Sequence, residues 1–300
     1  MTGSAIVGFV LLLAAAPLIP GVAVRAKSLA TGRRGAPIFQ LYYDLAKQWR
    51  RGTVYSGTAS SVVRLAPVAS LVTAVVAAAL VPLDGDRALF AFGGDVIAFA
   101  SVLALGRFVL VLGALDTGSS LPGMGASRDV TVSVFAEVAL FTTLIGLSAA
   151  TQGGDSLSVM LRGAVAGPNT ATAVTLLALA MLAVLLAEAG RGPVDDPATH
   201  LELTMIHEVM ILDHGGPDLT LLFYAAALRF SMLGAVIVGL FVPAWPAAGA
   251  LAATAGLLLV LAAVVGVIEG TTARLRLVRI PQFLVVATVL AALATVLGAH

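Results

Sequence analysis

The chain has 300 residues, of which 59% are hydrophobic and 11% are charged, and its formal net charge is +1. A soluble domain carries roughly a quarter charged residues, so this chain has too few to cover a water-facing surface. The composition therefore predicts an all-α polytopic membrane protein, and the near-zero net charge gives no sign of nucleic-acid binding. Because the chain has no cysteine, it cannot form disulfides, thiolate metal sites or iron–sulfur centres by itself.

Eight stretches are long and apolar enough to cross a bilayer core, which needs about 20 apolar residues per helix. They are 4–24, 60–83, 95–115, 130–150, 170–189, 219–242, 247–269 and 280–298. The first stretch lacks a basic segment before it and is long for the apolar part of a signal peptide, so we interpret it as a retained span. We expect these spans to form a single membrane domain over residues 1–300.

Positive charge is concentrated in alternate connections between the spans. The connections that carry it are 25–59, 116–129, 190–218 and 270–279, and the opposite side keeps only Arg87 and Arg162. The positive-inside rule then places these four loops in the cytoplasm and both termini on the outer side. We therefore expect a multi-pass protein of the cell's inner (plasma) membrane.

An additional helix is expected within the first cytoplasmic loop, over Pro37–Arg51. Pro37 suits a first helical turn, and an apolar stripe follows it at helical spacing. The members of the stripe are Ile38, Leu41, Tyr42, Leu45 and Trp49. Such an amphipathic helix lies at the membrane interface, where it either only anchors the loop or contributes to function.

Several ionisable residues fall within the spans or at their ends. They are Arg107 and Arg229 near the centres of spans three and six, Glu137 in span four, Glu188 at the end of span five and Glu269 at the end of span seven. An isolated charge at mid-bilayer costs from about 3 kcal/mol upward, so these groups must face one another, a water-filled cavity or a partner subunit. They form either an ion pathway or paired structural charges that lock the bundle.

The segment "RGPVDDPATHLELTMIHEVMILDHGGPDL", residues 191–219, gathers four aspartates, two glutamates and three histidines between apolar spans. Thr199 and Glu202 fit a capping box, and Gly215-Gly216-Pro217 fits a stop, which together predict a helix over 197–212.

Helical spacing places His200, His207 and Glu208 on one face of that predicted helix. A metal site made from these three is disfavoured, because the spacing is not the His-Glu-x-x-His of a zinc helix. Two interpretations remain: a solvated loop with ordinary charges, or a proton-coupling loop whose histidines and glutamates titrate near physiological pH.

A longer stretch, "AEAGRGPVDDPATHLELTMIHEVMILDHGGPDLTLLFYAAALR", resembles the signature of the membrane subunit of energy-converting [NiFe] hydrogenases, formate hydrogenlyase subunit 4 in particular. That family is a branch of a larger respiratory complex I (NADH-quinone oxidoreductase) family, whose members form the heel of the membrane arm. The segments "RRGAPIFQLYYDLAKQWRRG", "GMGASRDVTVSVFAE" and "EGTTARLRLVRIPQFL" resemble other parts of the family, so the likeness spans essentially the whole chain.

The resemblance implies a membrane-anchor and coupling subunit of a proton- or sodium-translocating oxidoreductase complex, with no cofactor in this chain. Its partners would be hydrogenase large and small subunits, a ferredoxin-like subunit and antiporter-like membrane subunits, besides lipid and, in one interpretation, quinone. The [NiFe] centre and the iron–sulfur clusters would belong to those partners. The cytoplasmic loops would face the soluble arm, where the ionisable groups of 191–219 would link redox chemistry to ion movement.

Residue by residue, the resemblance implies coupling roles for acidic positions along the chain. Glu188, Arg191, Asp195 and Glu202 match the acidic loop of the family, and Glu137 matches the membrane glutamate that follows the Arg128 segment. The proton-coupling set expected on this basis is Glu137, Glu188, Asp195, Glu202, Glu208, Asp213, His200 and His207. The charge-pairing set is Arg107, Arg128, Arg191 and Arg229.

Two positions depart from the complex I pattern and follow the hydrogenase branch. Val194 replaces the phenylalanine of the complex I loop, and Gly190 replaces the asparagine before the arginine. Both changes speak against a quinone-headgroup role. The alternatives that stay open are a quinone-site subunit of a complex I-like quinone oxidoreductase, with 38–51 at the mouth of its tunnel, and an anchor with no coupling role.

Overall fold

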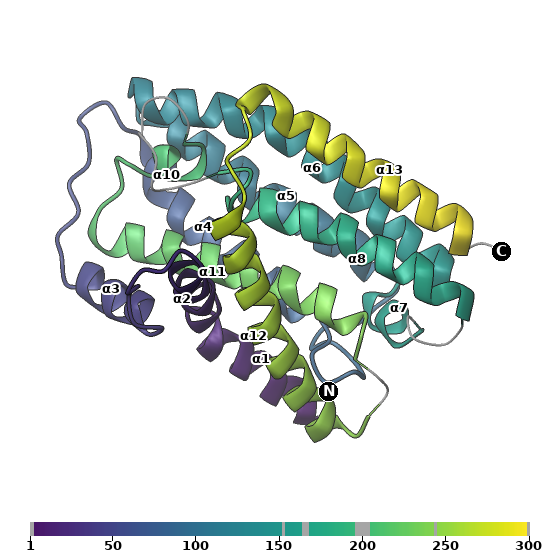
Figure 1. The fold of residues 1–300 in the computed structure, drawn as a ribbon. Helices are drawn as coiled ribbons and strands as arrows, with labels where there is room; N and C mark the ends of the chain where they lie inside the picture. Colours follow the sequence, from purple (N-terminus) through teal and green to yellow (C-terminus); the bar gives the residue numbers. More distant parts are fainter. Residues whose placement is uncertain (1–2, 152–153, 164–167, 196–204, 243–244, 299–300) are drawn as a thin grey trace.

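A computed structural model describes residues 3–151, 154–163, 168–195, 205–242 and 245–298, and over these residues all regular structure is helical (Figure 1). The helices are α1 (Gly3–Ala15), α2 (Leu18–Ala30), α3 (Gln40–Trp49), α4 (Ser61–Ala79), α5 (Asp95–Asp116), α6 (Ser120–Thr151), α7 (Leu157–Gly163), α8 (Pro168–Glu188), α10 (His207–Met210), α11 (Gly216–Gly239), α12 (Ala247–Thr271), the 3-10 turn η1 (Leu277–Arg279) and α13 (Ile280–Gly298).

Seven helices in the described part of the chain are long and apolar enough to cross a membrane, and the count rises to eight if the bent pair α1 and α2 forms one span. The seven are α4, α5, α6, α8, α11, α12 and α13. The first expected span, 4–24, falls on two helices, because α1 and α2 meet at a bend of 48°. Pro17 lies in the break, where its missing N–H cannot continue the helical hydrogen bonds.

The helix α11 lies at the centre of the bundle. It packs against α2, α4, α8 and α12, and most of its side chains are buried (Figure 1). A helix that is apolar on nearly every side is stable only when neighbours surround it. A second group, α6, α8 and α13, packs side by side, and α5 joins the two groups through contacts with α4 and α6 (Figure 1).

Helices extend into three of the cytoplasmic loops expected from the sequence. The helix α2 continues to Ala30 into the expected loop 25–59, and α6 begins at Ser120 within the expected loop 116–129. The expected loop 270–279 contains the end of α12 and all of η1. Charge marks the membrane boundary in a sequence, but it does not stop a helix from continuing beyond that boundary.

The amphipathic helix expected at Pro37–Arg51 is present as the shorter α3, Gln40–Trp49, with no buried residue. It lies against α2 and α11, and the Tyr42 hydroxyl donates a hydrogen bond of 2.6 Å to the Ala14 carbonyl at the end of α1. The side chains of Tyr43 and Trp49 are exposed. In Figure 1, α3 and α10 lie at one end of the bundle, and the start of α1 and the end of α13 lie away from that end.

The helix predicted over 197–212 is wrong in its described part. Residues 196–204 lie outside the described residues, Met205 and Ile206 are not helical, and α10 covers only His207–Met210. The backbone N–H groups of Ile206 and His207 both donate to the Asp195 carboxylate, at 3.0 and 3.2 Å. The carboxylate therefore caps the start of α10, as an N-cap side chain does, and α10 begins there.

Candidate coupling site

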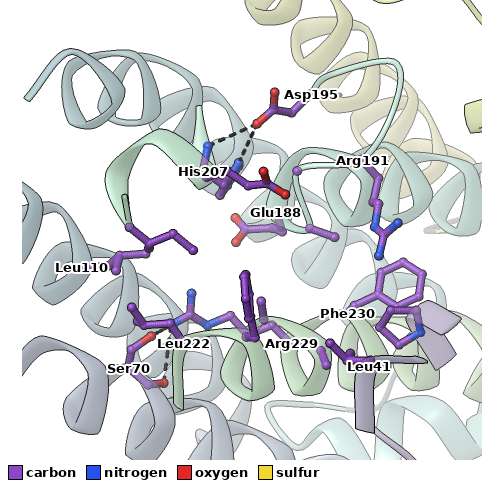
Figure 2. Close-up of a pocket in the computed structure, with 18 of the residues that line it drawn as sticks. Leu41, Ser70, Leu110, Glu188, Arg191, Asp195, His207, Leu222, Arg229 and Phe230 are labelled. Carbon is purple, nitrogen blue, oxygen red and sulfur yellow. Dashed lines mark hydrogen bonds and ion pairs between the residues drawn. The ribbon is translucent and has the colours of Figure 1, made fainter. Parts of the chain in front are cut away.

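A cavity of about 320 Å³ lies between α11 and the described residues 188–195 and 207–211 (Figure 2). Leu41 of α3, Leu110 of α5, and Leu222 and Phe230 of α11 give part of it an apolar lining. Its charged lining residues are Glu188, Arg191, Asp195, His207, Glu208 and Arg229. A largely apolar cavity with a few convergent ionisable groups is the usual form of a functional site.

One guanidinium at the membrane end of this region faces three carboxylates. The Arg107 side chain on α5 forms an ion pair with Glu188 at the end of α8, and it lies 3.8 Å from Asp129 and 3.9 Å from Glu137, both on α6. Arg107, Asp129 and Glu188 are largely buried, whereas the Glu137 side chain remains 38% exposed. The predicted membrane charges Arg107, Glu137 and Glu188 therefore do lie together.

The Arg107 cluster continues into the polar loop through a histidine. The His207 ring lies between two carboxylates, with Nε2 3.4 Å from Asp129 and Nδ1 3.5 Å from Asp195. Figure 2 shows the side-chain and backbone contacts of His207 with Asp195 above the cavity. Arg274, between α12 and η1, lies 3.4 Å from the other oxygen of Asp195. Ionic contacts thus run from Arg274 to Arg107 without a gap.

Neighbouring groups of opposite charge shift the pKa values of His207 and Asp195. Burial acts to lower the pKa of His207, but the contact with Asp195 and the charge of Asp129 outweigh it and raise that pKa above its usual value. Burial likewise acts to raise the pKa of the Asp195 carboxyl, but the contact with His207 and the two backbone N–H donors lower it below its usual value. The two residues thus each favour the charged form of the other.

A second ionic group ties the same loop to α2 and α12. The buried Glu269 carboxylate lies 2.9 Å from Lys27 Nζ and 3.4 Å from Arg191 Nη1. The Arg191 guanidinium also stacks over the Phe230 ring at 5.6 Å from its centroid. These contacts hold the start of the loop that follows α8 against the helix ends, next to the cavity.

The two remaining arginines of the expected pairing set both donate to neutral oxygens. Arg229 of α11 donates to the Ser70 hydroxyl of α4 at 2.5 Å, across the lower wall of the cavity in Figure 2. Arg128 donates to the Met205 carbonyl at 3.2 Å. Arg128 therefore also helps to hold the segment before α10, through a backbone oxygen that the sequence did not predict as its partner.

The other expected coupling residues lie apart from the cluster or outside the described residues. Glu208 lines the cavity but is exposed, and Asp213 is exposed in the turn after α10. His200 and Glu202 fall within residues 196–204, which lie outside the described part. Among the residues that the structure describes, no three histidine or acidic side chains are arranged so that they could hold a metal ion.

Sequence reasoning missed Asp129, which contacts both Arg107 and His207. It follows Arg128 in a stretch assigned to a loop, so it had the pattern of an ordinary surface aspartate. The signal that could have identified it is its place on α6 two turns before Glu137, because residues eight apart lie on one side of a helix.

The chain belongs to the NADH dehydrogenase family, whose model matches residues 3–299. This family includes the H-type subunits of respiratory complex I. The resemblance inferred from the loop motifs is therefore confirmed. The chain is 31% identical to hydrogenase-4 component C of Escherichia coli (strain K12) over 234 residues, which cover 78% of this chain and 73% of that protein. It is 29% identical to formate hydrogenlyase subunit 4 of the same organism over 279 residues, which cover 89% of this chain and 88% of that protein.

A solved structure shares the fold. The chain aligns with a TM-score of 0.82 and 16% identity, over 98% of each chain, to a chain in the structure of the membrane-bound sulfane sulfur reductase, an archaeal respiratory membrane complex. The relatives are thus components of oxidoreductase complexes, and the helices and the relatives together indicate a multi-pass membrane protein.

Proposed function

We propose that this chain is the membrane-anchor and coupling subunit of a proton- or sodium-translocating [NiFe]-hydrogenase-type complex. Hydrogenase large and small subunits and a ferredoxin-like subunit would dock on the polar loops, and antiporter-like subunits would lie beside it in the membrane. The [NiFe] centre and the iron–sulfur clusters would belong to those partners. The names of the two Escherichia coli relatives support the hydrogenase assignment.

The observation that carries this proposal is the ionic path from the polar loop into the membrane helices. The contacts run from Asp195 through His207 and Asp129 to Arg107, and Arg107 faces both Glu188 and Glu137. A change of charge above the loop changes the electrostatic free energy of each member in turn, because such interactions are weakly screened in a buried site.

In the mechanism we propose, electron transfer in the soluble arm changes the charge next to the loop. The ion pair of His207 and Asp195 changes first, and the strength of the ion pairs that Arg107 forms with its three neighbouring carboxylates changes next. Glu188 and Glu137 consequently gain or lose a proton, and the step passes to the antiporter-like partners. Glu208 and Asp213 would lie on the loop side of this route, and His200 and Glu202, outside the described residues, are proposed as further members of the coupling set.

The proposed topology has eight spans in the inner (plasma) membrane, with both termini on the outer side. The bent pair α1 and α2 supplies the first span, and the basic loop around α3 lies in the cytoplasm. The positive-inside rule supports this orientation, because the end of the bundle that holds α3 and α10 also holds the arginine-rich connections.

Neutral variants of the membrane carboxylates test the coupling role. In the purified complex reconstituted into vesicles, Glu188→Gln should lower ion uptake per hydrogen evolved at least tenfold, while hydrogen evolution from reduced viologen persists. The matched control is Asp155→Asn, an exposed aspartate in the connection before α7. Unchanged ion uptake in both Glu188→Gln and Glu137→Gln would contradict the coupling role and favour an anchor.

A second candidate function is a quinone site, which the cavity itself favours. Its lining is largely apolar, Leu41 of the interfacial helix α3 lies on it, and ionisable groups gather on one side. Quinone that co-purifies with the complex, together with viologen-dependent quinone reduction and no nickel, would support this candidate. Hydrogen evolution with nickel present and no bound quinone would support the hydrogenase assignment.

A further inference from the structure

The Asp129 side chain occupies a position between two cations that come from different parts of the chain. Its side chain is 3% exposed, its Oδ1 lies 3.4 Å from Nε2 of His207, and its Oδ2 lies 3.8 Å from Nε of Arg107. Oδ2 accepts no hydrogen bond within the described residues. A buried carboxylate that lacks such bonds depends on nearby positive charge for its stability.

The orientation of His207 favours its doubly protonated form. Each ring nitrogen faces a carboxylate, Nε2 toward Asp129 and Nδ1 toward Asp195. A neutral imidazole has one N–H donor and one acceptor nitrogen, so one of its nitrogens would face a carboxylate without a proton between them. The imidazolium carries a proton on both nitrogens and suits both neighbours.

The charged groups around His207 come from three elements. Asp129 on α6 and Asp195 in the loop after α8 both favour the imidazolium, whereas Arg107 on α5 opposes it. Glu188 neutralises part of the Arg107 charge through its own ion pair. Among these groups Asp129 is the one that contacts both His207 and Arg107, so it links the two side chains.

We propose that Asp129 is a positioning residue that keeps His207 protonated and so connects the polar loop electrostatically to Arg107 in the membrane. This role rests on the proposed coupling function and adds to it a specific link. When Asp129 is neutralised, His207 loses one of its two neighbouring carboxylates, and Arg107 keeps ionic contacts with Glu188 and Glu137 alone among the described residues. The loop and the membrane carboxylates then respond to charge independently.

The test measures the protonation of His207 directly in the assembled complex. Diethyl pyrocarbonate modifies only the neutral imidazole, and mass spectrometry of the peptide that contains His207 reports the extent of modification at each pH. His207 lines the cavity, and its side chain is 26% exposed in this chain by itself, so a small reagent that enters the cavity can reach it. Asp129→Asn should lower the pKa of His207, which raises its modification at a fixed pH below the midpoint about tenfold or more.

Variants separate a charge effect from a general structural defect. Asp129→Glu should restore the wild-type modification profile, and Asp155→Asn should leave it unchanged. If Asp129→Asn does not assemble, the combination with His207→Gln should restore assembly, since no imidazolium then needs the carboxylate. Identical profiles in wild type and Asp129→Asn, or a double variant that fails although His207→Gln assembles, would overturn the proposal.

The modification assay needs no turnover, so its outcome is separate from that of the coupling function. A wild-type complex that moves no ions but shows the expected shift would refute the coupling function and leave the His207–Asp129 link standing. Loss of ion uptake in Glu188→Gln, with an unchanged modification profile of His207 in Asp129→Asn, would support the coupling function and refute the His207–Asp129 link. In a coupled complex, the pH profile of ion uptake should move to lower pH in Asp129→Asn and return in Asp129→Glu.

Discussion

Replacement of Arg107 by glutamine is the most informative perturbation of this bundle. Arg107 is the one described cation that faces Glu188, Asp129 and Glu137 together. Glutamine keeps much of the side-chain length and some hydrogen-bonding capacity but removes the charge. The variant therefore leaves carboxylates close together in a buried site without the countercharge of Arg107.

The distances set the size of the expected effect. At 3.8 and 3.9 Å, and with an effective dielectric constant of about 20, each pair contributes an attraction of about 4 kcal/mol. Much of that attraction offsets the desolvation of the ions, and the net loss when one partner of a buried pair is removed is about 3 to 5 kcal/mol. We expect Arg107→Gln to lower the free energy of unfolding by that amount.

Detergent titration of the purified chain, followed by circular dichroism, measures this loss. The control is Arg162→Gln, since Arg162 pairs with Asp86 at an exposed site where an ion pair contributes about 1 kcal/mol or less. The double variant Arg107→Gln with Glu188→Gln should regain part of the loss, because fewer carboxylates then lack a cation. A loss in Arg107→Gln no larger than in the control, or no recovery in the double variant, would refute the reasoning.

Two further predictions concern the loop. Gly190→Ala should displace His207 and lower the free energy of unfolding by about 1 to 3 kcal/mol, because φ is +55° and an added Cβ would lie 2.6 Å from Nδ1 of His207. The control for the backbone conformation is Gly94→Ala, since φ there is +87° and the added Cβ would meet open space. Equal losses of stability in the two variants would contradict the steric part of the argument. Burial lowers the pKa of His214 against the opposing charge of Asp218, so His214 contributes stability above its unfolded pKa of about 6.5 that is lost as the pH falls through the lower folded pKa. His214→Gln should flatten that acid-side loss in a pH series of unfolding titrations, and an unchanged slope would show that His214 does not control it.

Composition and periodicity were sufficient for the class of the protein and for most of its helices. Long apolar runs predict spans because each backbone polar group in a bilayer must be bonded within its own segment. The centres of α4, α5, α8, α11, α12 and α13 follow from this argument. Their ends do not, as α6 shows by beginning at Ser120, because a helix can continue past the membrane boundary wherever other elements pack against it.

The sequence by itself also determined which residues had to find partners. Arg107, Glu137 and Glu188 could not stay isolated in lipid at a cost of about 3 kcal/mol or more each, so their pairing was predictable even though their partners were not. The loop motifs likewise identified the family, because long motifs carry information that no single spacing carries.

Only the tertiary structure decided which carboxylate belongs to which cation. Asp129 and Asp195 are far apart in sequence, and they meet on the two sides of His207 because α10 packs against α6. The start of α10 was decided in the same way, when the Asp195 carboxylate took the backbone N–H groups of Ile206 and His207. Such contacts depend on helix packing across the bundle, and periodicity within one segment contains no information about them.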